Sequence, residues 1–299
     1  MIKKTKQLEV QELKALEQLR ALCKKTDGST PNLYTHILDQ PRTFPASLLY
    51  YEQQELVGFL GAYFFYEDAV EISLLVNPLY RKRGIGKQLI DTILPLIQSQ
   101  NYGKLIFSNP AQLNNSWLIP NGFSYLHSEY YMERDDLNPL LDYKQILTFR
   151  NAISDDIPLL CALDEACFPA KQSDSTERFQ HLIDGREYQV ILAYQNNKLI
   201  GKAHIRWQPE GATLSDIAIV PSQQGKGLGS TLIIYCINLA LSEGKPHLNL
   251  DVETHNERAL KLYTRLGFVT KNACDYWTID LNKLLNKKTS STKKKTDRK

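Results

Sequence analysis

The strongest constraint on the fold is an internal repeat, because the same order of strand, turn and helix signals occurs twice along the chain. Gly84 and Gly227 lie 143 positions apart in matching turns, and the dipeptides at 122–123 and 267–268, both Gly-Phe, lie 145 apart. A spacing that holds to within two residues over a whole domain indicates duplication. The 299 residues suffice for two domains of about 150 residues each, and each of these can bury its own core.

The second copy shows the order of elements most clearly. Apolar patterning predicts strands over residues 189–194, 199–207 and 213–220, and Asn196-Asn197 forms the turn between the first two. A glycine-rich turn leads into an apolar-faced helix over 230–242. A buried strand over 247–252 and a second helix over 257–265, ended by Gly267, complete the copy.

The first copy repeats this order with strands over 47–51, 56–65 and 70–76, a helix over 86–99 and a strand over 105–107. Asn138 and Pro139 interrupt the pattern between the copies. We therefore expect an N-terminal domain over 1–137, a linker over 138–146 and a C-terminal domain over 147–285.

The net charge of +3 is concentrated in the last segment, 286–299, which holds seven basic residues and one acid. A basic tail without apolar residues cannot bury enough surface to fold, so we expect it to be disordered. Nucleic-acid binding rests on this tail alone and is disfavoured, since no basic and aromatic recognition motif accompanies it. The sequence sets no oligomeric state.

The apolar runs and the cysteines of the chain indicate the compartment in which the protein resides. No run reaches the roughly 18 to 20 residues that span a bilayer, and the N-terminus does not resemble a secretory signal. The five cysteines are odd in number and show no CxxC spacing, which disfavours a disulfide framework or a zinc site. We expect a cytoplasmic protein that needs no membrane and no metal.

Two glycine-rich turns are the main candidate binding elements. Each lies between a predicted strand and a predicted helix, where unpaired backbone N–H groups converge at the positive end of the helix and favour an anion. The alternatives are a structural turn and a nucleotide loop, but neither turn has dinucleotide or triphosphate-loop spacing. The candidate residues are Arg81, Lys82, Arg83, Gly84, Ile85, Gly86 and Lys87 in the first turn, and Gln224, Gly225, Lys226, Gly227, Leu228, Gly229 and Ser230 in the second.

Both turns share the pattern [Arg/Gln]-x-x-Gly-x-Gly with a proline upstream, which resembles the pyrophosphate-binding loop of the GNAT superfamily of N-acetyltransferases. The segment 256–268 resembles the later motif of that superfamily, and 149–169 resembles its first strand and helix. The resemblance covers about residues 6 to 281.

This resemblance implies an α/β fold with two tandem acyl-CoA N-acyltransferase domains, each a mixed, mostly antiparallel sheet flanked by helices. It also implies acetyl-CoA as the donor. The acceptor would be an amine, on a small molecule or at a protein N-terminus or lysine. The rival hypothesis is a non-catalytic acyl-CoA sensor or interaction protein.

The resemblance assigns catalysis to the second domain. Tyr263 matches the tyrosine that faces the coenzyme sulfur and would protonate the leaving thiolate, although it could instead pack on its helix face. Asp251 and Glu253 share one face of a strand end, where either could take the proton of the amine or hold a cationic acceptor. Both could also be solvated acids.

Coenzyme contacts are expected from two further places. Asn256 would contact the coenzyme or cap a helix. The backbone of Ile217, Ala218 and Ile219 would bind the pantetheine arm, and one N–H there would stabilise the oxyanion. We interpret His204, His247 and His255 as packing or surface residues, because their spacing fits no metal site.

The first domain departs from this pattern. Aligning the Gly-Phe pairs places Leu118 opposite Tyr263 and Ala111 opposite Asn256, and Pro120 falls where the helix should end. The first domain should therefore bind the coenzyme without turnover or serve a structural role. An acid at a shifted position, Tyr125 or Tyr130, would restore activity.

Overall fold

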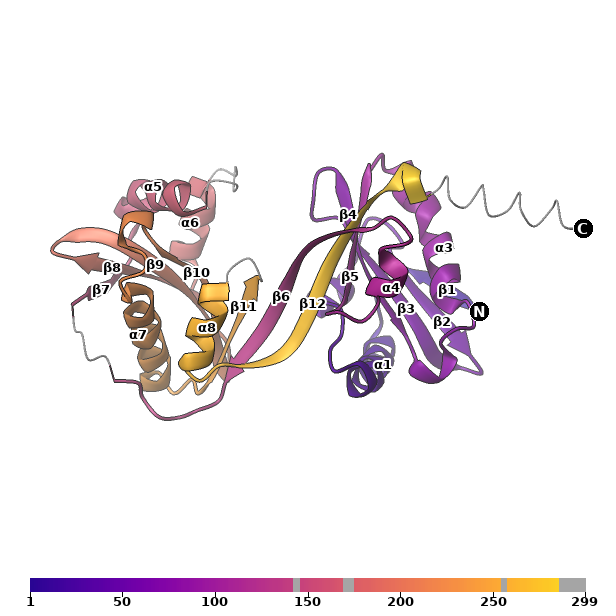
Figure 1. The fold of residues 1–299 in the computed structure, drawn as a ribbon, viewed down its shortest axis with the longest axis horizontal. Coiled ribbons are helices and arrows are strands. Elements are labelled where there is room, and N and C mark those ends of the chain that lie inside the picture. Colours follow the sequence, from indigo (N-terminus) through magenta and orange to yellow (C-terminus); the bar gives the residue numbers. More distant parts are fainter. Residues whose placement is uncertain (142–145, 169–174, 254–256, 285–299) are drawn as a thin grey trace, which may run out of the picture. The chain divides into compact units, whose positions relative to one another are not determined.

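The computed structural model describes residues 1–141, 146–168, 175–253 and 257–284. These form two compact units (Figure 1). Unit 1 contains residues 1–130 and 272–284 together with Glu253. Unit 2 contains residues 131–252 and 257–271.

The sheet of unit 1 has the strand order β1-β2-β3-β4-β5-β12-β6. Its strands are β1 (Ile2–Thr5), β2 (Ser47–Glu52), β3 (Glu55–Tyr63), β4 (Ala69–Val76), β5 (Lys104–Pro110), β12 (Val269–Asp280) and β6 (Ser124–Arg134). Residues 269–271 of β12 and 131–134 of β6 count with unit 2. The β4–β5 pair is parallel. The β1–β2, β2–β3, β3–β4 and β5–β12 pairs are antiparallel.

Helices cover both faces of this sheet. Helix α1 (Val10–Asp27) buries Leu16 and Leu19 in one apolar cluster, and α3 (Ile85–Ser99) buries Leu89 and Ile93 in another. Alternation along each strand sends successive side chains into the two clusters in turn. Short helices are α2 (Thr35–Leu38), α4 (Asn115–Leu118) and the 3₁₀ helix η1 (Pro78–Tyr80).

Unit 2 repeats the plan with the order β11-β10-β9-β8-β7. The strands are β7 (Thr148–Asn151), β8 (Tyr188–Gln195), β9 (Lys198–Trp207), β10 (Gly211–Ile219) and β11 (His247–Glu253), and only β10–β11 is parallel among these pairs. Helices α5 (Ile157–Cys167) and α6 (Ser175–Asp184) pack on β8, whereas α7 (Leu228–Ser242) packs on β9 and β10 (Figure 1). The others are η2 (Ser154–Asp156), η3 (Pro221–Gln223) and α8 (Glu257–Arg265).

These elements confirm the expected mixed α/β fold with mostly antiparallel sheets flanked by helices. Each strand and helix expected from periodicity is present, with ends shifted by no more than a few residues. The five cysteines form no disulfide. No helix within the described ranges is both long and apolar enough to cross a membrane. The basic segment 286–299 lies outside the described residues.

The last strand of the chain belongs to the first unit. β12 pairs with β5 from Cys274 opposite Pro110 to Asp280 opposite Lys104. The two compact units are therefore not two consecutive stretches of the chain. The sheet of unit 1 includes a strand that follows the second copy in the sequence. Where the sequence predicts the start of a linker, the side chain of Asn238 in α7 exchanges two hydrogen bonds of 2.8 Å with the backbone of Leu140.

Candidate functional site

The two glycine-rich loops have the same backbone conformation. α3 begins after Gly84 and α7 after Gly227, both with φ of 82° in the left-handed region that glycine adopts without steric cost. Lys82, with φ of 62°, stands in the first loop where Gly225, with φ of 78°, stands in the second. Both loops thus present a helix N-terminus with free amide groups, which is a site that favours an anion.

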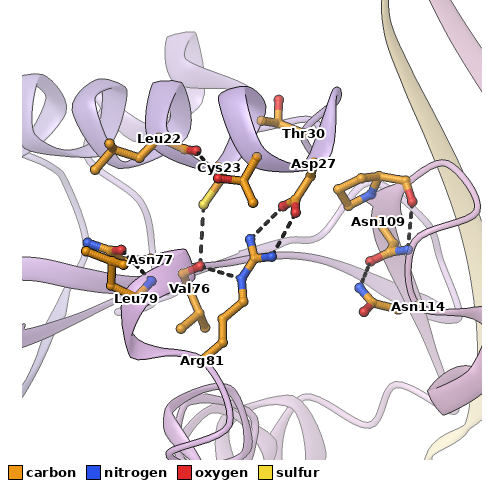
Figure 2. A network of polar contacts seen from close by, with 12 residues as sticks. Leu22, Cys23, Asp27, Thr30, Val76, Asn77, Leu79, Arg81, Asn109 and Asn114 are labelled. Atoms are coloured by element: carbon orange, nitrogen blue, oxygen red, sulfur yellow. Dashed lines mark hydrogen bonds and ion pairs between the residues drawn. The ribbon is translucent and has the colours of Figure 1, made fainter.

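The first side chain of each loop pattern anchors the loop to the preceding strand. Arg81 Nε donates to the carbonyl of Val76 at 3.1 Å, and its two terminal nitrogens bind the Asp27 carboxylate at 2.7 and 2.6 Å (Figure 2). In unit 2, Gln224 Nε2 donates to the carbonyl of Ile219 at 2.8 Å. The other cations of the loops have partners of their own, since Lys87 binds Asp91 at 2.5 Å, Arg83 donates to the Leu79 carbonyl at 3.2 Å and Lys226 donates to Gln223 at 2.7 Å.

A cysteine reinforces the same anchor in both units. Cys23 Sγ donates to the Val76 carbonyl at 3.5 Å (Figure 2). Cys167 Sγ donates to the Ile219 carbonyl at 3.6 Å. Burial raises the pKa of both thiols, so they stay protonated. Cys23 and Cys167 therefore occupy equivalent positions and contact equivalent carbonyls. The two copies match in individual contacts as well as in secondary structure.

Each loop borders a cavity. The cavity of unit 2 has a volume of about 1300 Å³ and is lined by loop residues 223–230, by Ile217 and Ile219 of β10, and by residues 258–265 of α8. The cavity of unit 1 is smaller, about 690 Å³, and its lining includes loop residues 84–87 and the apolar side chains of Phe107, Trp117 and Phe123. The volume in unit 1 falls in the range of small-molecule sites, roughly 300 to 1,000 Å³, and the volume in unit 2 exceeds it.

Tyr263 of α8 lines the cavity of unit 2. It is 8% exposed, and its ring meets that of Phe268 edge to face with the centroids 5.9 Å apart. Burial raises the pKa of Tyr263 to about 12, so the phenol is protonated at neutral pH and is a weaker acid than a free tyrosine. In unit 1, Leu118 is fully buried at the corresponding place before the Gly-Phe pair.

The central strand of unit 2 is interrupted beside this cavity. The β9–β10 ladder shifts register between Ser215 and Ala218, and the parallel β10–β11 ladder runs only from Gly211 to Thr213 on β10. Ile217 and Ile219 line the cavity on either side of Ala218, which pairs with Lys202. In unit 1 the β3–β4 ladder continues without a shift from Gly58 opposite Val76 to Tyr63 opposite Glu71.

The predicted acids on β11 lie on one face of the strand. Asp251 and Glu253 are exposed and alternate with buried Leu250 and Val252. Glu253, however, groups with unit 1, where its carboxylate lies near His127 and Glu129. Asn256 and His255 lie outside the described residues.

A buried ionic cluster next to the strand interruption was not predicted from the sequence. Asp164 of α5 binds Lys202 of β9 at 2.6 Å and also binds Arg178 of α6. Lys202 is fully buried, and its burial lowers the pKa of its ammonium. The sequence held one signal for this cluster. Lys202 and His204 are polar residues two positions apart in an otherwise apolar strand, so both point to the same buried face.

The same cluster reaches the interruption itself through Asp216. This residue has a positive φ of 45°, and its carboxylate lies 3.3 Å from His204 Nδ1 and 3.3 Å from Arg178. Burial, with the positive charge of Lys202 3.2 Å from Nε2, lowers the pKa of His204, so the ring is neutral at physiological pH. The cluster therefore combines a neutral imidazole with a carboxylate at its Nδ1 and an ammonium at its Nε2.

Comparison with known proteins agrees with this geometry. The model of the acetyltransferase (GNAT) family matches residues 13–116 and 157–268, one match in each copy and together more than half of the chain. The chain belongs to the GNAT family of N-acetyltransferases.

Several named relatives are acetyltransferases. The chain is 27% identical over 230 residues to the mycothiol acetyltransferase of Acidothermus cellulolyticus, which covers 67% of this chain and 68% of that protein. It is 34% identical over 84 residues to the [ribosomal protein bS18]-alanine N-acetyltransferase of Escherichia coli, covering 28% and 57%. A GCN5-related N-acetyltransferase from Sphaerobacter thermophilus has the same fold, with a TM-score of 0.76 at 15% identity over 94% of this chain and 95% of that one.

Proposed function

We propose that this protein transfers an acetyl group from acetyl-CoA to an amine and that unit 2 performs the reaction. The observation that carries the proposal is the meeting of three features at one cavity, namely the glycine-rich loop, the interrupted strand β10 and the phenol of Tyr263. The cavity of unit 1 has the loop but neither the interruption nor the tyrosine. The named relatives, a mycothiol acetyltransferase and a ribosomal-protein alanine N-acetyltransferase, support a small molecule or a protein amino group as the acceptor.

Coenzyme binding would begin at the loop. The amides of residues 225–230 and the N-terminus of α7 would hold the pyrophosphate, with Lys226 adding charge. The pantetheine arm would run along residues 217–219, where β10 parts from β11 and leaves backbone groups available. This path leads the thioester from the loop to the strand interruption.

The reaction forms a C–N bond and breaks the C–S bond of the thioester. The amine must first lose a proton, and the candidates to receive it are Asp216 with His204, and the predicted acids Asp251 and Glu253. A backbone N–H of the interrupted strand would donate to the tetrahedral oxyanion. Tyr263 would give its proton to the departing sulfur.

A matched set of loop variants tests the proposal. Gly227→Glu places a negative charge where the pyrophosphate would lie, so binding of acetyl-CoA to unit 2 and turnover should be lost. Gly227→Ala imposes the same backbone strain at φ of 82° without the charge and should keep measurable turnover. Gly84→Glu makes the equivalent change in unit 1 and should leave turnover intact. Full turnover by Gly227→Glu would reject the proposal.

Unit 1 is proposed to bind the same coenzyme through residues 81–87 without turning it over. Its apolar cavity and its loop cations support binding, and Leu118 lacks the proton that Tyr263 can give. A sensor without catalysis is the alternative for the whole protein, and release of free coenzyme A thiol in the presence of an amine separates the two. The free cysteines favour a reducing compartment, and we propose the cytoplasm.

A further inference from the structure

The cavity of unit 1 has an apolar part beyond its glycine-rich loop. Leu74 of β4, Ile90 of α3 and Leu284 line this part, and all three side chains are half-buried. The rings of Phe107 and Phe123, which are almost fully buried, line it as well. A ligand in this part of the cavity therefore meets mainly aliphatic and aromatic groups, which favour apolar surface.

Polar side chains of the same cavity bond to neighbouring groups of the protein. Asn109 Nδ2 donates to the carbonyl of Pro110 at 2.9 Å, and its Oδ1 accepts from Asn114 (Figure 2). Arg81 binds the Asp27 carboxylate nearer the loop. Because these groups are occupied, burial of apolar surface is the main gain that this part of the cavity offers a ligand.

A short helix borders this part of the cavity. α4 has four residues, whereas α8 of unit 2 has nine. Pro120 follows α4 and lacks the N–H that a continuing helix would use. The cavity of unit 1 reaches Leu105 and Phe107 of β5, but that of unit 2 is lined by none of the described residues of the corresponding strand, β11. We attribute the deeper reach in unit 1 to the shorter helix.

Two large apolar side chains of the cavity wall are exposed. Trp117 of α4 is 47% exposed and Leu113 is 40% exposed. The ring centroids of Trp117 and Phe123 lie 5.8 Å apart, and those of Phe123 and Phe107 lie 6.0 Å apart. A row of rings thus runs from exposed to buried surface within one cavity. An apolar ligand group would cover this surface.

We propose that unit 1 binds a coenzyme A thioester with a medium-length apolar acyl chain in preference to acetyl-CoA, and that the chain lies in this apolar part of the cavity. The inference rests on the proposed binding of the coenzyme to residues 81–87. Leu118, at the place of Tyr263, belongs to the same apolar cluster as Phe107 and Phe123. A thioester that reaches this place meets apolar groups, and each methylene that leaves water strengthens binding.

Calorimetric titration of the full chain carrying Gly227→Glu tests this inference, because that substitution blocks the loop of unit 2 and leaves unit 1 to be measured. Octanoyl-CoA should bind more tightly than acetyl-CoA by about tenfold or more, since it buries six further methylenes. Free octanoate should bind more weakly than octanoyl-CoA, because it lacks the pyrophosphate. Gly84→Glu added to Gly227→Glu should abolish binding of both thioesters.

Two exposed aliphatic residues supply matched variants in the Gly227→Glu background. Leu113→Asn places a polar side chain in the cavity wall and should weaken binding of octanoyl-CoA by about fivefold or more, with acetyl-CoA changed less than about twofold. Ile119→Asn makes a similar change at a residue that is 60% exposed and does not line the cavity, so both affinities should stay within about twofold. Because both residues are exposed, we expect both variants to fold.

Equal affinity for octanoyl-CoA and acetyl-CoA would overturn the inference and leave coenzyme binding by unit 1 intact. An equal loss in Ile119→Asn and Leu113→Asn would also overturn it, because binding would not depend on the cavity wall. Octanoate that binds as tightly as octanoyl-CoA would assign the cavity to a free fatty acid instead. Absence of binding by either thioester would reject both the inference and the coenzyme role of unit 1, whereas acetyl transfer by the wild-type protein would still support the function proposed for unit 2.

Discussion

The two units differ most clearly at single positions within a shared plan. Cys23 and Cys167 make the same contact, as do Arg81 and Gln224 with the last carbonyl of the central strand. The position before the Gly-Phe pair diverges, with a phenol in unit 2 and a fully buried leucine in unit 1. The residues that anchor the loop are thus equivalent in both units. The position of the proposed general acid is not, because unit 2 has Tyr263 where unit 1 has Leu118.

Tyr263→Phe tests the acid in unit 2. The substitution keeps the ring contact with Phe268 and removes only the hydroxyl, so the melting temperature and the affinity for acetyl-CoA should change little. Turnover should fall by roughly 10² to 10⁴, the usual effect of losing a general acid. Tyr235→Phe, whose half-buried ring stacks on Phe149 in the same unit, is the matched control and should keep full turnover. Normal turnover in Tyr263→Phe would show that another group protonates the thiolate.

Glu71 should make stability depend on pH. Its pKa is raised to about 7 in the folded protein against 4.5 for an ordinary glutamate, so folding favours the protonated form. The resulting stability is present below about pH 4.5 and is lost as the pH rises through 7, a change of up to about 3 kcal/mol. We expect the free energy of unfolding of Glu71→Gln, relative to wild type, to rise between pH 5 and pH 8 in chemical denaturation. A difference that does not vary with pH would contradict the raised pKa.

At the scale of elements, the interruption of β10 distinguishes the two central strands. The register shift coincides with a positive φ at Asp216, whose carboxylate reaches His204. The β3–β4 ladder has no such shift. The parallel ladder stops short of the loop in both units, after Thr213 in β10 and after Ser73 in β4. The irregularity of β10 therefore distinguishes unit 2 by its positioned carboxylate.

Paired asparagine substitutions separate the candidate bases. If Asp216 orients His204 to receive the proton of the amine, Asp216→Asn should lower turnover by about 10² or more. Asp251→Asn removes an exposed acid nearby and should then have a small effect. A larger loss of turnover in Asp251→Asn than in Asp216→Asn would instead assign the general base to the exposed face of β11. Steady-state kinetics of thiol release between pH 6 and 9 measures both.

The element pattern explains which features the sequence could predict. Period-two and helical patterning predicted the central strands of both sheets and helices α3, α7 and α8, because those depend on which local residues are apolar. It did not predict β1, β6, β12 or α1. The loops followed from glycine spacing. The interruption at Ser215–Ala218 could not be found, since residues 213–220 read as a regular strand and a bulge depends on its pairing partners. The Asp164–Lys202 pair was missed for the same reason, as its members lie on α5 and β9.

At the scale of the whole molecule, the first sheet depends on the end of the chain. The predicted pattern of the second copy ended at Gly267, so neither β12 over residues 269–280 nor its pairing with β5 was foreseen. The contacts involve side chains as well as backbone. Tyr276 donates to Glu129, Asn272 binds the backbone of Thr30 twice at 2.9 Å, and Trp277 and Ile279 belong to the core of unit 1.

Fragments test this dependence. Residues 1–137 alone should aggregate or fail to fold cooperatively, because β5 is left as an unpaired edge and the core loses Trp277. Adding a synthetic peptide of residues 269–284 should restore a cooperative unfolding transition in circular dichroism. A peptide of the same composition in scrambled order is the control and should not do so. A stable, monomeric 1–137 fragment without the peptide would show that β12 is dispensable.

The pairing of β12 with β5 also sets an order of events during synthesis. Domains that consist of one continuous stretch can fold as soon as that stretch has left the ribosome, usually from the N-terminus onward. Unit 1 has most of its residues early, yet its sheet must wait until residues 272–280 have been translated. During that interval β5 exposes an edge that a neighbouring nascent chain could pair with. The half of the protein that is made first is thus the last to be finished, and chaperones would protect it longest.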